Sequence, residues 1–333
     1  MGNNDTTSAP SPASESNDSL SGAQAALGFP EAFHGFFWSF AFSAAAVMNH
    51  CHMQTGDKVW FGVKIFILVM SFPANAALMW MLLKRKRAMT ASEVLGLNVS
   101  VMDILYCLCL PLDIYTCLHE VSKAAHSVHE AVFALNIFGC PLLLTFMCLE
   151  RYVAVARPVA YLTLGQWKYR VALCACAWIL TLTVGLLGYF VGVFTLALPL
   201  SIIISLLFLV MLLCLLGIVW VLCQSAPGEA SRSSVPLKRR ALKNIVAVMV
   251  PSAVAYSPLV ALVPYMAVIT SSQTISSAQC YVLQVLLVFP NIGLFIGPMF
   301  YLSRLRQVTC WTPSSKTLAE ETTSTSLKLR NIR

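Results

Sequence analysis

The chain has 333 residues, of which 58% are hydrophobic and only 11% are charged, and its formal net charge is +8. Soluble globular proteins carry about 25% charged residues, so this composition argues against an ordinary cytosolic enzyme, a disordered protein and a nucleic-acid-binding protein. The apolar residues fall in blocks of about 20 or more, which are long enough to cross the hydrocarbon core of a bilayer as helices. The sequence therefore predicts an all-α membrane protein.

The N-terminal segment is rich in Ser, Asn, Ala and Pro over residues 1–30 and is typical of a disordered tail. It contains no Lys or Arg, so the basic start of a cleavable signal peptide is missing. Asn4 and Asn17 each begin a glycosylation sequence that is usable if the tail lies outside the cell. The apolar run from Gly35 to Met48 is short for a span, and we expect it to lie at the membrane interface or on the bundle, with an extra span as the alternative.

Seven longer apolar blocks follow and predict seven transmembrane helices, because lipid offers no partner for the backbone N–H and C=O groups of any other single segment. The blocks run approximately Trp60–Leu83, Val94–Tyr115, His129–Ala154, Tyr169–Phe190, Thr195–Leu222, Lys243–Val268 and Gln279–Leu302. We therefore divide the chain into an extracellular, mostly disordered segment (1–59), a seven-helix domain (60–308) and a cytoplasmic tail (309–333).

The basic residues predict the orientation. Of the 22 Lys and Arg residues, 19 fall in or beside the segments between spans one and two, three and four, five and six, and after span seven. Basic residues concentrate on the cytoplasmic side of membrane proteins. This places the N-terminus outside and the C-terminus inside, which requires an odd number of spans and agrees with seven.

Polar and helix-breaking residues recur at particular places inside these spans, and the third span ends in a charged triplet. They are Asn75, Asp103, Asn136, Glu150-Arg151-Tyr152, Trp178, Pro258, Pro298 and Tyr301. In order, spacing and span, these residues resemble the rhodopsin-like (class A) G-protein-coupled receptors from about residue 60 to 308. Phe72-Pro73-Ala74-Asn75, Leu110-Pro111 and Asn136-Ile137-Phe138-Gly139 are similar to the branch that contains purinergic and protease-activated receptors.

The resemblance implies a seven-helix bundle in the plasma membrane that passes an extracellular signal to a heterotrimeric G protein by outward movement of span six. It implies a short amphipathic helix after span seven, over residues 303–307, and a palmitoylation site at Cys310. The Ser/Thr run from Thr322 to Ser326 suits phosphorylation and arrestin binding.

The same resemblance assigns switch roles. Glu150 holds Arg151 at rest, and Tyr152 completes this triplet. Pro258 and Pro298 act as hinges because proline removes a backbone hydrogen bond. Tyr256 replaces the usual tryptophan of the family, and Tyr301 turns inward near Arg151. The base of span six is Lys238-Arg239-Arg240 and offers no acidic partner for Arg151, which suggests raised basal activity.

Asp103 lies in mid-membrane, where an unpaired carboxylate is costly. In the family, the matching acid binds a sodium ion, here with Asn75 and Asn136 as neighbours. Cys140, Gly293 and Gly297 stand where the family has hydroxyl or amide groups. Two interpretations stay open: a sodium site, or a protonated or hydrogen-bonded Asp103. We expect no other cofactor or metal.

The outer halves of the spans predict a mostly apolar pocket. Its polar lining candidates are Lys64, Asp113, His129, Glu130 and Gln284. Spans six and seven carry no Arg or Lys in their outer halves, which disfavours nucleotides and small carboxylates as ligands. An apolar or amphipathic ligand fits better, although these five side chains could instead face water or each other.

The family disulfide between span three and the second outer loop is missing here, because His126 occupies the first position and no Cys lies between spans four and five. By resemblance to the purinergic-like branch, Cys51 and Cys280 could pair instead, with Cys117 as a competing partner.

Two other classes of function compete with a signalling receptor. One is a receptor fold that acts constitutively or as a decoy, which the altered switch positions favour. The other is a small transporter or channel, although the chain shows no internal repeat and few intramembrane charges. An enzyme is disfavoured because the sequence contains no HExxH, no GxSxG and no paired acid–base set.

Overall fold

The computed structural model describes residues 31–52, 57–84, 89–118, 123–157, 159, 161, 166–224, 254–272 and 274–310. Within these ranges the regular structure is helical throughout, without strands. Asn4, Asn17 and the Thr322–Ser326 run lie outside the described residues.

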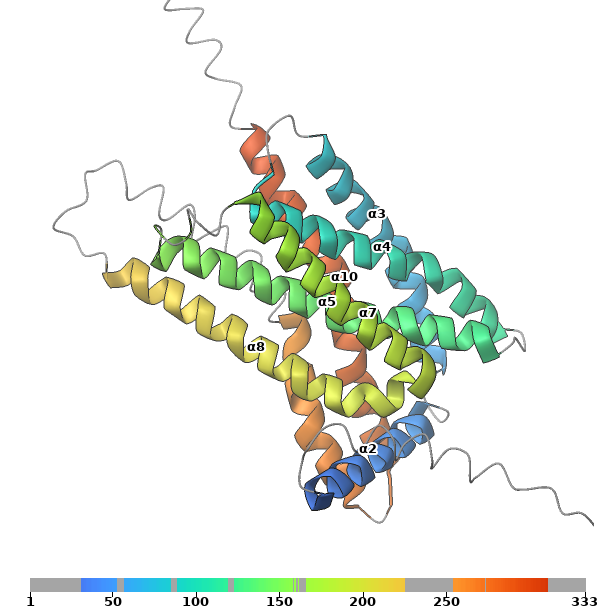
Figure 1. Cartoon of the computed structure of the whole chain (residues 1–333). Coiled ribbons are helices and arrows are strands. Elements are labelled where there is room, and N and C mark those ends of the chain that lie inside the picture. The colour runs from blue at the N-terminus through green and yellow to red at the C-terminus, as the bar shows by residue number, and fades with distance from the viewer. Residues whose placement is uncertain are drawn as a thin grey trace, which may run out of the picture.

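Six of the described helices are long and apolar enough to cross a membrane. They are α3 (Asp57–Leu83), α4 (Ala91–Leu118), α5 (Lys123–Ala156), α7 (Trp167–Val191), α8 (Val193–Gln224) and α10 (Ser277–Cys310). A shorter apolar helix, Val254–Thr270, carries the described part of the predicted sixth span. Together they form the predicted all-helical bundle of a multi-pass membrane protein (Figure 1).

The central helix is α5, which packs against α4, α7 and α8. The packing is tight at Gly139, where an added Cβ would lie 2.5 Å from Met102 Sδ of α4 and 2.7 Å from Thr181 Cγ2 of α7. Large apolar side chains on the outer faces of α7 and α8, such as Leu186 and Trp220, are exposed, as lipid-facing side chains are.

The last turn of α7 and the first turn of α8 are joined by Gly192 alone. Its φ is 84°, a left-handed conformation that glycine adopts without steric cost. Its N–H donates to the carbonyl of Gly188, which closes the end of α7. We call the end of the bundle that contains this junction the outer end.

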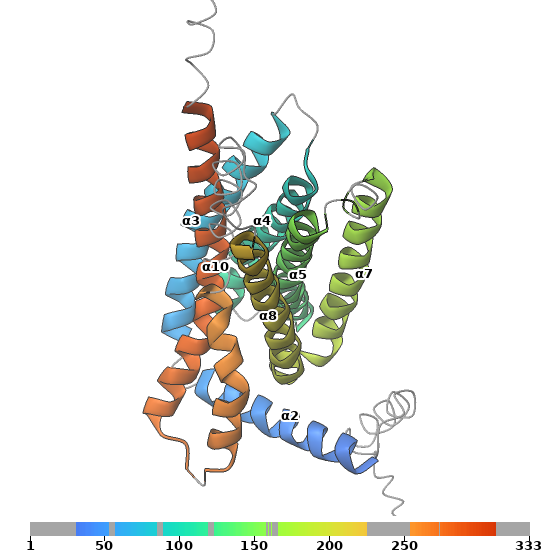
Figure 2. The ribbon, with the colours of Figure 1, turned by 90° about the vertical axis from the view of Figure 1, so that its left-hand side faces the viewer.

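The helix α2 (Glu31–Cys51) lies across the outer end, as Figure 2 shows. Its buried residues recur every three or four positions, at Ala41, Ala44, Val47, Met48 and Cys51, so that one stripe of the helix faces the bundle. It packs on α8 and α10 and is not among the helices long and apolar enough to span. The part of the apolar run from Ala41 to Met48 therefore lies on the bundle, whereas Gly35 at its start is exposed.

Two boundaries differ from prediction. The separate amphipathic helix expected over residues 303–307 is absent, because α10 continues through this segment to Cys310. No Gly or Pro follows Pro298 within the helix to end it. Likewise, α5 begins at Lys123 instead of His129, since the polar residues before the apolar block, including His126, are compatible with a helix.

Candidate functional site

The outer half of the bundle contains a cavity of about 470 Å³, which we call the outer cavity. Residues from α2, α3, α4, α5, α8, the Val254–Thr270 helix and α10 line it. Its walls are mainly apolar and include Phe133, Ile137, Leu200, Ile204 and Leu259.

A buried ionic cluster interrupts these apolar walls. Lys64 Nζ of α3 lies 2.6 Å from Asp113 Oδ2 of α4, and His129 Nε2 of α5 lies 3.2 Å from the same oxygen. Lys64 is 9% exposed and Asp113 is 3% exposed. Removing two opposite charges from water is tolerated when they pair closely. Three predicted lining residues therefore meet at one point, although they come from three helices.

The other two predicted lining residues take different positions. Glu130 lines the outer cavity, and its Oε1 lies 3.6 Å from His126 Nε2, one turn earlier on α5. Gln284 of α10 is not in the lining. Its side-chain oxygen accepts a hydrogen bond of 2.6 Å from Nε1 of Trp60, and this indole lines the cavity in its place.

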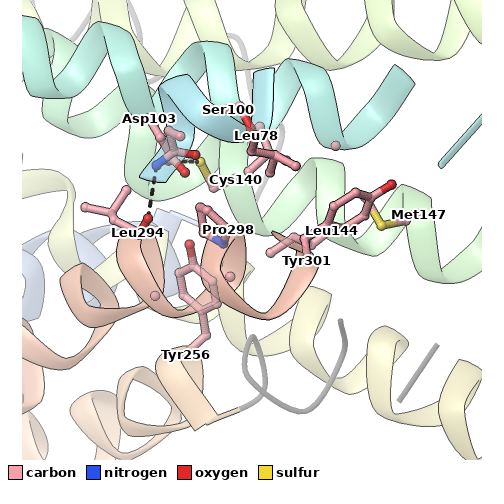
Figure 3. Close-up of a pocket in the computed structure, with 15 residues that line it drawn as sticks. Leu78, Ser100, Asp103, Cys140, Leu144, Met147, Tyr256, Leu294, Pro298 and Tyr301 are labelled. Carbon is pink, nitrogen blue, oxygen red and sulfur yellow. Dashed lines mark hydrogen bonds between the residues drawn. The ribbon is translucent and has the colours of Figure 1, made fainter. Parts of the chain in front are cut away.

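A second, smaller cavity of about 60 Å³ surrounds Asp103, and we call it the inner cavity (Figure 3). Asp103 Oδ1 accepts a hydrogen bond of 2.9 Å from Asn136 Nδ2 and one of 3.2 Å from Cys140 Sγ. Asn75 Nδ2 donates to the backbone carbonyls of Leu294 and Ser71. The residues grouped from the sequence around Asp103 thus form one network across α3, α4, α5 and α10.

The network fits a sodium ion poorly. A hard cation needs oxygen ligands, and the groups that point at Asp103 Oδ1 are an amide N–H and a thiol, which would have to be displaced. Gly293 and Gly297 line the cavity without any side-chain ligand. The buried oxygens of Asn75 and Ser100, which lack hydrogen-bond partners among the described residues, suit ordered water.

Three predicted switch residues also line the inner cavity. Tyr256 of the Val254–Thr270 helix and Pro298 of α10 both lie on the side of the cavity that faces Asp103, as Figure 3 shows. Tyr301 extends toward Met147 of α5.

The other predicted switch residues lie elsewhere. Pro258 lies two residues beyond Tyr256 and outside this lining. Tyr152 faces α8 instead, where a Cβ on Gly217 would lie 2.6 Å from Tyr152 Cε2.

At the opposite, inner end of α5, the carboxylate of Glu150 has three partners. Its Oε1 accepts a hydrogen bond of 2.6 Å from the hydroxyl of Tyr161, and its Oε2 accepts one from the hydroxyl of Ser92. Arg151 Nε lies 3.5 Å from Oε2. Burial and the neighbouring Glu150 raise the pKa of Tyr161, so its hydroxyl stays a donor.

Ser92 and Tyr161 were not predicted from the sequence. Ser92 is 58 positions from Glu150, and only the packing of α4 on α5 brings them together. Trp178 of α7 was singled out in the sequence but its partner was not: its Nε1 donates a hydrogen bond of 2.8 Å to Asn98 of α4.

The structure contains the disulfide between Cys51 and Cys280, which fastens the end of α2 to the start of α10 across 229 positions of the sequence. Both cysteines are thereby engaged, so the competing pairing with Cys117 does not occur.

The matches to known proteins agree with one another, because each of them is to a receptor. The family model for the 7 transmembrane receptor (rhodopsin family) matches residues 74–196, which run from α3 to the start of α8. Proteinase-activated receptor 3 of Homo sapiens is 29% identical over 40% of this chain and 36% of its own length. Purinoceptor 8 of Gallus gallus is 25% identical over 36% of this chain and 35% of its own length. Lysophosphatidic acid receptor 5 of Bos taurus is 29% identical over 35% of this chain and 32% of its own length.

The chain thus matches about a third of each relative's length. The matched part nevertheless contains most of the motifs singled out above, from Asn75 to Trp178. All three relatives are receptors, and two of them represent the purinergic and proteinase-activated groups. In these matches and in its helical bundle, the chain is similar to the rhodopsin-like (class A) G-protein-coupled receptors, and the relatives that it matches include members of the purinergic and proteinase-activated groups.

Proposed function

We propose that this receptor responds to an amphipathic extracellular ligand that occupies the outer cavity. The observation that carries the proposal is the buried ion pair of Lys64 and Asp113, with the imidazole of His129 beside it, set into walls that are mainly apolar. Ligand sites combine apolar lining with a few placed polar groups that orient the ligand. A ligand with one polar head and an apolar remainder matches this distribution.

The polar head is best neutral or zwitterionic. Lys64 is already engaged by Asp113 at 2.6 Å, so an anionic head would have to compete with a buried carboxylate. Glu130 adds a second acid to the lining. Nucleotides and small carboxylates are therefore disfavoured. One relative is named for lysophosphatidic acid, which supports an amphipathic ligand as a class but does not fix the head group.

The route from ligand to G protein follows the Val254–Thr270 helix. Leu259 and Leu262 of this helix line the outer cavity, whereas Tyr256, about one turn away, lines the inner cavity. Pro258 lies between them and weakens the helix at that point. A ligand that displaces the leucines therefore moves Tyr256 against Asp103 and Pro298, and the inner part of span six swings outward.

At the inner end, this movement exposes Arg151 to a heterotrimeric G protein. In the resting state Glu150 is fixed by Ser92 and Tyr161 and lies beside Arg151. We place the receptor in the plasma membrane, with the N-terminus outside, and expect arrestin to bind the phosphorylated tail. We propose that Asp103 functions as a hydrogen-bonded group and requires no sodium ion.

The experiment is a coupling screen across the G-protein classes, with surface expression matched between variants. We expect the parent to activate at least one class on addition of zwitterionic or neutral single-chain lipids, and Arg151→Ala to abolish the response. Lys168→Ala is the matched control, because this exposed cation belongs to α7 and not to the triplet. Equal responses from the parent and Arg151→Ala would contradict the mechanism.

The altered switch residue Tyr256 also supports a second function, in which the receptor fold signals constitutively or binds ligand without signalling. The same screen separates the two. A signal that is present without lipid and lost in Arg151→Ala indicates constitutive coupling, whereas silence in every class with every lipid indicates a decoy.

A further inference from the structure

The outer cavity has a wall that comes from outside the transmembrane helices. Met48, Asn49 and His52, at the end of α2 and just after it, line the cavity together with residues of the bundle. The ring of His52 meets that of Phe194 on α8 edge-on, with 5.7 Å between the centroids. The N-terminal segment is therefore part of the cavity and not merely adjacent to it.

Nothing between α7 and α8 is available to cover the cavity, because Gly192 is the whole connection between these helices. The position that a longer loop would occupy is taken by α2, which lies across the outer end and packs on α8 (Figure 2). Ala41 and Ala44 are fully buried on the side of α2 that faces the bundle, and their small side chains allow α2 to approach the bundle closely.

Two attachments hold α2 in this place. One is the buried stripe, whose members Ala44, Val47 and Met48 belong to the main hydrophobic core together with Leu196 and Leu200 of α8. The other is the disulfide between Cys51 and Cys280, which fixes the end of α2 nearest to the cavity. A cross-link over a long loop limits the local opening of the segment that it closes.

We propose that α2 is a covalently fastened roof of the ligand cavity, and that Asn49 and His52 contact the ligand as selectivity-determining residues. The proposal rests on the proposed function in taking an amphipath as the occupant. The amide of Asn49 and the imidazole of His52 supply hydrogen-bonding groups for the polar head of such a ligand. The ligand of this receptor is then selected in part by the N-terminal segment.

The test measures access to the cavity and needs no ligand. Ser201 of α8 lines the cavity and is 3% exposed, so Ser201→Cys introduces a nearly isosteric reporter thiol. A cationic, membrane-impermeant methanethiosulfonate reagent is applied to intact cells, in a Cys117→Ser background, and the rate of modification is followed. The same protein without Ser201→Cys provides the background rate.

Two variants loosen the roof by independent means. Cys51→Ser combined with Cys280→Ser removes the cross-link, and Ala44→Arg places a long charged side chain under α2, where the exposure is 0%. We expect each to speed modification of the reporter about tenfold. Phe42→Ser, on the exposed side of α2, is the matched control and should keep the parent rate. If the double variant does not reach the surface, reduction of the parent on intact cells replaces it.

Equal rates in the parent, the cross-link variant and Ala44→Arg would overturn the roof. Fast modification of the parent itself would overturn it too. Because the readout is chemical access, it is independent of G-protein coupling. If the two variants speed modification as expected but the protein fails the coupling screen, the proposed function would be refuted and the roof would stand.

Discussion

The carboxylate of Glu150 is held by individual hydrogen bonds, on which the proposed resting state depends. It is restrained from two sides, by Ser92 of α4 and by Tyr161 in the segment after α5, and it also lies beside Arg151. No acid is present at the base of span six, where the sequence is basic. In the proposed mechanism, the hydrogen bonds of Glu150 provide the restraint that a salt bridge to span six would otherwise provide.

We expect Tyr161→Phe to raise ligand-free signalling. The substitution keeps the ring and removes a hydrogen bond to a charged group, which is typically worth about 1.5–3 kcal/mol. If the bond exists only at rest, the active population rises about tenfold or more. Basal G-protein activation, normalised to surface expression, measures the effect. Tyr169→Phe alters an exposed tyrosine and should have no effect, and unchanged basal signalling in Tyr161→Phe would show that this bond does not restrain the receptor.

The ion pair between Lys64 and Asp113 leads to a prediction about stability. We expect Lys64→Met to destabilise the protein by about 3–5 kcal/mol, because it leaves a buried carboxylate without its cation. The double variant Lys64→Met with Asp113→Leu should recover most of this loss. Thermal unfolding of the detergent-solubilised receptor compares them.

The control for this prediction is Lys168→Met, which alters an exposed cation and should change stability by less than about 0.5 kcal/mol. A double variant no more stable than Lys64→Met would show that the cost comes from lost packing and not from the buried charge.

At the scale of elements, the close contact at Gly139 sets the spacing of α4, α5 and α7. We expect Gly139→Ala to destabilise the protein by about 1–3 kcal/mol, since the new Cβ overlaps Met102 Sδ and Thr181 Cγ2. Gly62→Ala on α3 is the control, because no atom lies within 4 Å of its added Cβ and alanine favours a helix.

A rescue identifies the cause. Thr181→Ser removes the clashing methyl group but keeps the hydroxyl, which bonds to the Ala177 carbonyl at 2.6 Å. Thermal unfolding should show that Thr181→Ser restores part of the stability of Gly139→Ala. Gly139→Ala as stable as the parent would mean that the helices move apart without cost.

The helices themselves could largely be predicted from the sequence, because a span is a local property: a run of apolar residues of sufficient length. All six long spans lie where the apolar blocks predict them, although α5 and α10 extend beyond their blocks. These extensions were missed because residues such as His126 are polar yet compatible with a helix. The apolar residues show which part of a helix lies in the lipid, but they do not show where the helix itself begins and ends.

The candidate site was predictable only in part, for a related reason. Lys64, Asp113 and His129 could be recognised one at a time as polar residues in apolar spans, but their meeting depends on the rotation of three helices. The resemblance to the receptor family predicted that Asp103 and Asn136 are neighbours. It could not identify Tyr161 or the contribution of His52, which arise from packing between distant segments.

The whole molecule has two functionally different ends. The outer cavity lies at the end of the bundle where α5 begins, and Glu150 and Arg151 lie at the opposite end, where α5 finishes. A receptor works only if the first end faces the extracellular side. The distribution of basic residues favours this orientation, because 19 of the 22 lie in or next to the segments at the Arg151 end.

We therefore expect an epitope tag at the N-terminus to be detected on intact cells, and one at the C-terminus only after permeabilisation. Glycosidase treatment should also increase the mobility of the parent on a gel, and Asn4→Gln with Asn17→Gln should remove this shift, because glycans are added only on the luminal side that becomes extracellular. Detection of both tags from the same face would require an even number of spans. In that case either the outer cavity would open to the cytosol or Arg151 would face away from the G protein, and the signalling route along the Val254–Thr270 helix would have no function.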